Sequence, residues 1–172
     1  NVYQVFPVVF INVLDPATHK TAVTETTCSV TDKQAVLNVF GMIKSSVVVK
    51  DGSDTLTLGT DYTLEFDSNG YLVVTLISGS THASATTLKI SGNKLDPSAI
   101  TASDIVGAYN VNTGAETGME VIRQVYPKLG VVPGLLLAPG WSQVPTVGIA
   151  LMAKAANING CFKAMALLDL ED

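Results

Sequence analysis

The sequence has few charged side chains and a single arginine, Arg123. Charged residues make up 15% of its 172 positions and hydrophobic residues 47%, so the chain is apolar for a soluble protein. The formal net charge is −5. Nucleic-acid binding needs clustered lysine and arginine to displace counterions, so this composition argues against a nucleic-acid partner. A chain this apolar is expected to bury much of its surface, against itself or against copies of itself.

Cysteine and long apolar runs are also scarce. Cys28 and Cys161 are far apart in the sequence, which favours two buried thiols in a reducing compartment over a disulfide bridge. No run reaches the roughly 18 apolar residues of a membrane span. The run Val5–Leu14 is too short for one, and it lacks the basic leader of a signal peptide. Because the sequence starts at Asn1 and stops just after a predicted core strand, we expect it to be part of a longer protein.

The hydrophobic pattern changes twice along the chain. Val5–Leu14 is nearly continuous in apolar residues, which is typical of a strand buried on both faces of a parallel sheet. From residue 21 to 95, Thr, Ser, Val, Gly and Asp dominate, and Val36–Ile43 is ambiguous between strand and short helix. Asp67–Gly70 predicts a hairpin turn. Strands are expected on either side of that turn and elsewhere in this region: Ser46–Lys50, Tyr62–Phe66, Tyr71–Ile77 and Thr86–Ile90.

After residue 96 the sequence predicts helices and strands in alternation. Thr101 and Asp104 resemble a capping box for a helix Ala102–Ala108. A further helix is expected to bury Met119, Ile122, Val125 and Leu129. Strands at Leu135–Ala138 and Phe162–Leu170 flank a helix that starts near Pro145. The predicted fold is a partly parallel open α/β sheet core, formed by residues 1–20 and 96–172, that is interrupted by an inserted small antiparallel β domain at 21–95.

Two turns carry residues that could form a site. The loop Asn112–Gly118 precedes a helix, but it lacks the GxGxxG and GK[ST] patterns of nucleotide-binding loops, and Glu116 stands where a phosphate would approach. Ser142 lies in a strand-to-helix turn without a GxSxG elbow, so we expect it to cap the helix. An enzyme would need converging titratable groups, and the candidates are Glu116, Glu120 and Ser142. We therefore predict no catalytic residue and no cofactor site.

The sequence predicts no metal site either. His19 and His82 stand apart from other ligand types and are expected to be exposed. Cys161 has no neighbouring histidine and is expected to be a packed thiol. Trp141 either anchors its turn on the sheet or lies at an interface. The acidic residues of the β domain lack the spacing of a calcium loop and are expected on a solvated face: Asp51, Asp54, Asp61, Glu65 and Asp67.

Several short strings, in this order and spacing, resemble the tail sheath proteins of contractile phage tails, including those of P2-like phages and prophages. They are densest after Lys94, in Lys94–Ser98 (KLDPS), Leu137–Ser142 (LAPGWS) and Asn157–Gly160 (NING). Val13–Pro16 and Gly59–Tyr62 extend the resemblance over almost the whole chain.

The resemblance implies a structural protein of the virion rather than an enzyme, assembled in the bacterial cytoplasm. Sheath proteins form hexameric rings stacked around a tail tube, and their contraction drives the tube through a cell envelope. The resemblance also implies that the β domain protrudes from the surface of the α/β core. The family's N-terminal region and its C-terminal region, with the tube-facing part and the inter-subunit arm, are not in this sequence, so we expect the chain alone to be monomeric or weakly associating.

Two other classes of protein stay open. A cell-surface adhesion or carbohydrate-binding module would need an exposed aromatic platform, for which Tyr62, Phe66 and Tyr71 are available, although their pattern is typical of a core face. An α/β enzyme is the less favoured alternative.

Overall fold

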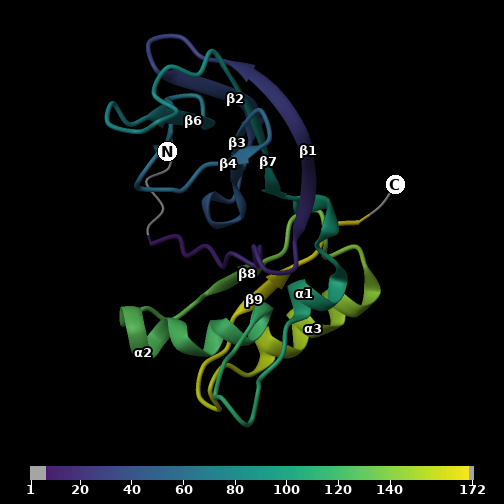
Figure 1. Ribbon diagram of the computed structural model, residues 1–172. Coiled ribbons are helices and arrows are strands. Elements are labelled where there is room, and N and C mark those ends of the chain that lie inside the picture. The colour runs from purple at the N-terminus through teal and green to yellow at the C-terminus, as the bar shows by residue number, and fades with distance from the viewer. Residues whose placement is uncertain (1–6, 171–172) are drawn as a thin grey trace. The chain divides into compact units, whose positions relative to one another are not determined.

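The computed structural model describes residues 7–170, which divide into two compact units (Figure 1). One unit is Asp15–Ala99, and the other is formed by the segments before and after it in the sequence. The sequence predicts an inserted domain at residues 21–95. Its protrusion from the protein surface stays a prediction.

The unit Asp15–Ala99 is built from two antiparallel sheets. One has the strand order β1-β7-β3-β4 and the other the order β2-β6-β5. A short 3₁₀ helix, η1 (Lys44–Ser46), precedes β3, and η2 (Pro97–Ala99) follows β7. The strands are β1 (Lys20–Ser29), β2 (Gln34–Phe40), β3 (Val48–Asp51), β4 (Asp54–Thr55), β5 (Tyr62–Phe66), β6 (Tyr71–Leu76) and β7 (Thr87–Leu95).

Alternating burial gives this unit a core of its own. In β6, Leu72, Val74 and Leu76 are buried and the residues between them are partly exposed, as expected when one face of a strand packs inward. Side chains from both sheets join the same apolar cluster, which includes Ala35, Leu37, Val49, Leu88 and Ile90. Burial of these side chains is the main source of the unit's stability.

The predicted hairpin turn at Asp67–Gly70 is confirmed. The Asp67 carboxylate accepts hydrogen bonds from the amides of Asn69 and Tyr71, at 2.9 and 2.8 Å. Gly70 has φ of +79°, a conformation that glycine adopts without strain. The ambiguous segment Val36–Ile43 is largely strand, in β2. Strand β1 was not predicted, because most of its residues are exposed and its sequence therefore shows no apolar alternation.

In the second unit, short helices pack around a two-stranded sheet. The helical segments are α1 (Ala102–Val106), the 3₁₀ helix η3 (Gly118–Gln124), α2 (Val125–Leu129) and α3 (Pro145–Ala156). Strands β8 (Leu135–Leu137) and β9 (Met165–Leu167) pair in parallel, with α3 as the connection between them. The predicted capping box of α1 is confirmed, since the Asp104 carboxylate accepts hydrogen bonds from the amide and the hydroxyl of Thr101.

One apolar cluster holds this unit together. Met119 and Ile122 of η3 and Val147 and Leu151 of α3 are buried in it with Leu136 of β8. Val125 is also buried, but Leu129, predicted on the same helical face, is 58% exposed. Pro145 occupies the first turn of α3 as predicted. An amide at this position would have no acceptor within the helix, so the proline costs no hydrogen bond.

The predicted fold class is wrong. The sheets are mostly antiparallel, and within residues 7–170 the parallel pairing of named strands is confined to β8 and β9. Pro7–Leu14 contains no strand, whereas Val5 and Phe6 of the predicted Val5–Leu14 strand lie outside the described residues. The predicted strand Phe162–Leu170 is limited to β9. An apolar, β-branched run favours a strand only where a neighbouring strand takes up its amides and carbonyls, and periodicity does not reveal whether one is there.

Candidate functional site

Ser142 lies in the loop between β8 and α3, where it joins two parts of the second unit. It is 4% exposed, and its hydroxyl accepts a hydrogen bond of 2.7 Å from the amide of Asp169, just after β9. The Asp169 carboxylate in turn accepts a hydrogen bond of 2.8 Å from the amide of Gly140. The prediction that Ser142 caps α3 is wrong, because Val144 is the N-cap and no side chain caps the helix. Its hydroxyl instead links the loop before α3 to the segment after β9.

The loop before η3 is folded against α1. Gly118 has φ of +54°, and a Cβ atom there would lie 2.5 Å from the carbonyl oxygen of Asp104. The Glu116 carboxylate, 9% exposed, accepts a hydrogen bond of 2.9 Å from Gln124 and lies 3.5 Å from the guanidinium of Arg123. The Glu116 carboxylate is thus held at η3 by two side chains of that helix.

The three candidates for enzyme chemistry have separate partners. Glu116 bonds Gln124 and Arg123, Glu120 forms an ion pair with Lys154, and Ser142 bonds Asp169. None of the contacts recorded for residues 7–170 joins one candidate to another. The arrangement supplies no nucleophile that is activated by a neighbouring base.

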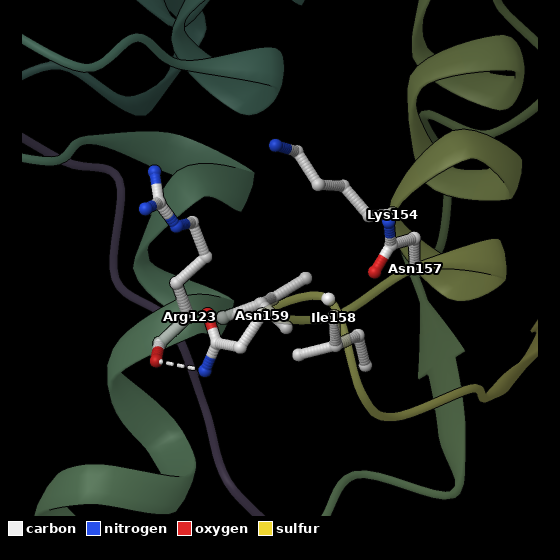
Figure 2. Close-up of a pocket in the computed structure, with 7 residues that line it drawn as sticks. Arg123, Lys154, Asn157, Ile158 and Asn159 are labelled. Carbon is white, nitrogen blue, oxygen red and sulfur yellow. Dashed lines mark hydrogen bonds between the residues drawn. The ribbon is translucent and has the colours of Figure 1, made fainter.

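A cavity of about 430 Å³ lies beside the end of α3 (Figure 2). Arg123 and Lys154 reach it from η3 and α3, and the Asn159 amide donates a hydrogen bond of 2.8 Å to the Arg123 carbonyl. Both cations already have carboxylate partners, and the carbonyl end of a helix carries partial negative charge, which disfavours an anion. The remaining lining residues are Ile122, Asn157, Ile158 and Gly160.

The acidic residues of the β unit are divided among local hydrogen bonds. Asp61 accepts hydrogen bonds from the Ser80 hydroxyl at 2.6 Å and the Thr57 amide at 2.8 Å, and these bonds lower the pKa of its carboxyl. Asp51 lies 3.0 Å from His82, and Asp67 holds its turn. Over the described part of the chain, no three His, Cys, Asp or Glu residues gather as a metal site would require.

The predictions for both histidines and for Cys161 are wrong. His19 was expected to be exposed but is 5% exposed, with its Nδ1 accepting a hydrogen bond of 2.9 Å from the Asp15 amide. Cys161 was expected to be packed but is exposed, whereas Cys28 is buried and burial raises the pKa of its thiol. His82, which was also expected to be exposed, is partly buried, and its Nδ1 lies 3.0 Å from the Asp51 carboxylate.

Among the described residues, the aromatic side chains available for a carbohydrate-binding platform differ widely in exposure. Tyr62 is 3% exposed and belongs to the core of the β unit. Phe66 is 44% exposed, and the Lys44 ammonium stands 4.9 Å above its ring. Trp141, whose role the sequence left open, packs against the core of the second unit. Phe40, which the sequence analysis did not single out, is 72% exposed.

The β8–β9 sheet presents an apolar face to solvent. Leu136 and Ala166 pack into the core beneath it. Their neighbours point the other way by the alternation of strands, and they are 51 to 69% exposed: Leu135, Leu137, Met165 and Leu167. We call these four residues the outer sheet face. The sequence signal is the unbroken apolar composition of both strands, which is typical of strands that are buried on both faces.

Helix α3 also has apolar residues on the side away from the core. Ile149 is 63% exposed and Met152 is 47% exposed, whereas Val147 and Leu151 are buried. A helix that is apolar on all sides is normally covered on all sides. Among the residues that the structure describes, no helix is long and apolar enough to cross a membrane.

Comparison with known proteins gives one informative result. No family model matches the sequence, and no solved structure matches it. The chain is similar to a tail sheath protein of Burkholderia phage BcepMu, with 30% identity over 164 residues. The match covers 94% of this chain and 33% of that protein, so the chain spans about one third of the length of its relative. This similarity confirms the resemblance that the motifs indicated.

Proposed function

Starting from this relationship to a phage tail sheath protein, we propose that the chain is part of a structural subunit of a contractile tail sheath. The full-length subunit surrounds the tail tube as stacked hexameric rings, and its contraction drives the tube through the cell envelope. The observation that carries the proposal is the match along nearly the whole chain, which runs through both compact units.

The surface chemistry supports a structural role. Polar side chains that could act in catalysis are engaged in local pairs, as at Glu116, Glu120 and Ser142. The exposed side of α3 instead offers large apolar side chains, Ile149 and Met152. Apolar surface of this kind is what a chain needs in order to bury area against other polypeptide in an assembly. On this proposal the protein is a virion component that assembles in the bacterial cytoplasm before it joins a tail.

Electron microscopy of the full-length protein tests the proposal. The protein should be expressed alone and together with the tail tube protein of the same phage or prophage. We expect tubes or stacked rings, with the tube protein inside them when both are present. A gold label on Ser53→Cys, in the exposed turn between β3 and β4, should decorate the outer wall if the β unit protrudes. Compact particles that form neither rings nor tubes in either preparation would contradict a sheath function.

A further inference from the structure

The two sides of the β8–β9 sheet differ sharply in burial. Leu136 is 7% exposed and lies in the cluster with Val147 and Leu151 of α3, whereas Leu137, the next residue, is 53% exposed. On β9, Met165 is 69% exposed. In Figure 1, β8 and β9 run side by side with α3 next to them. One side of the sheet is therefore covered by a helix and the other is open within the described residues.

Parallel strands are normally covered on both faces. The connection between two such strands is a crossover that packs on one face, as α3 does here, and the other face is covered by helices of further crossovers. Each strand here is three apolar residues long, Leu135–Leu137 and Met165–Leu167, without a polar side chain. A solvated face would alternate with polar residues. The composition of both strands is thus that of an interior layer.

We propose that a helix from another part of the same, longer polypeptide packs on the outer sheet face. The sheath protein of phage BcepMu is about three times as long as the matched segment, so a polypeptide of that size has ample chain to supply the helix. An obligate, intramolecular partner also fits the chemistry, because surfaces that exchange partners carry more polar groups than this one. The inference rests on the relationship to a longer sheath protein, not on ring formation or contraction.

Cysteine reactivity in the full-length polypeptide tests this inference. Leu137→Cys, Leu136→Cys and Ser53→Cys are made separately in a background in which Cys161 and any other reactive cysteine are serine. Maleimide labelling rates are measured on dilute protein that light scattering shows to be monomeric. We expect Leu137→Cys to react at least about tenfold more slowly than Ser53→Cys, because only local opening would expose it. Leu136→Cys, on the already covered side of the same strand, gives the rate for a buried thiol.

The same variants in the 172-residue chain supply the matched comparison. There Leu137→Cys should react nearly as fast as Ser53→Cys, while Leu136→Cys stays protected. Met165→Cys, on the paired strand, repeats the measurement if Leu137→Cys fails to fold. Fast labelling of the outer sheet face in the full-length monomer would overturn the inference. Protection that develops only on self-assembly would also overturn it, since a second copy would then be the cover. The labelling rates of the full-length monomer and of the 172-residue chain can be measured whether or not the protein forms tubes.

Discussion

Short polar side chains in this molecule mainly organise the nearby backbone. The Ser142 hydroxyl accepts a hydrogen bond from the amide of Asp169, and the Asp67 carboxylate accepts bonds from two amides of its own turn. Each bond satisfies a donor that folding would otherwise leave without a partner, which costs about 1–3 kcal/mol when the donor is buried. At the residue scale, the Ser142 hydroxyl and the Asp67 carboxylate therefore stabilise the local backbone.

His82 and Asp51 form a pair that responds to pH near neutrality. Their hydrogen bond raises the pKa of His82 above its ordinary value of 6.5, while burial acts in the opposite direction. The folded state thus favours protonated His82, and the stability from the pair is present below that ordinary value and lost as pH rises through the raised pKa.

We expect His82→Asn to lower the melting temperature of the β unit at about pH 6 and to change it much less at about pH 9. Thermal unfolding followed by circular dichroism at both pH values checks this. The carboxyls of Glu25, Asp61 and Asp96 have lowered pKa values, so their contribution to stability is lost only in acid and does not interfere. An equal loss at both pH values would show that His82 acts by packing alone.

At the scale of elements, turns and helix caps were predictable from the sequence, whereas strand pairing and burial were not. The turn at Asp67–Gly70 and the capping box of Thr101 and Asp104 depend on residues close in sequence, and both were predicted correctly. The strand expected over Val5–Leu14 depends on a neighbouring strand, and Pro7–Leu14 does not form one. Likewise, the burial of His19 depends on how the chain folds around it, which spacing does not reveal.

Helix α3 approaches the loop before it so closely that one position needs glycine. A Cβ atom at Gly148 would lie 2.8 Å from the carbonyl oxygen of Ser142, so the backbone would have to shift. Alanine is about 1 kcal/mol better than glycine in a helix, but overpacking costs about 1–3 kcal/mol. We expect Gly148→Ala to destabilise the second unit by up to about 2 kcal/mol in urea titrations.

Gly134→Ala is the matched control, because nothing lies within 4 Å of a Cβ atom there and its φ is not in the left-handed region. It should change the free energy of unfolding by less than about 0.5 kcal/mol. A Gly148→Ala protein that is more stable than the original would mean that helix propensity outweighs the contact with Ser142.

On the scale of the whole molecule, the two units have separate apolar cores. One core joins the two antiparallel sheets of Asp15–Ala99, and the other joins η3, α3 and the β8–β9 sheet. The sequence revealed a change of composition near both ends of the β unit, and the motifs indicated the relationship to sheath proteins. The sequence could not show which apolar surfaces are covered. The composition of β8 is that of a buried strand, yet Leu135 and Leu137 are 51% and 53% exposed in this chain.

Separate cores predict separate unfolding. Leu136→Asp places a charge in the core of the second unit, which we expect to destabilise that unit by more than about 3 kcal/mol while the β unit stays folded. Leu135→Asp, on the outer sheet face of the same strand, should cost about 1 kcal/mol or less in the 172-residue chain. Urea unfolding of both variants is followed by amide hydrogen exchange, which measures the stability of each unit separately. Loss of protection in both units with Leu136→Asp would indicate a single cooperative molecule.

The pairing of the first and last strands of the β unit has an evolutionary consequence. Lys20 at the start of β1 is opposite Leu95 at the end of β7, and the Thr21 hydroxyl donates a hydrogen bond to the Asp96 carboxylate. The chain therefore enters and leaves this unit at neighbouring points. A lineage can gain, lose or exchange such a cassette without stretching the polypeptide on either side, and the same junction gives engineers a place to graft a foreign domain.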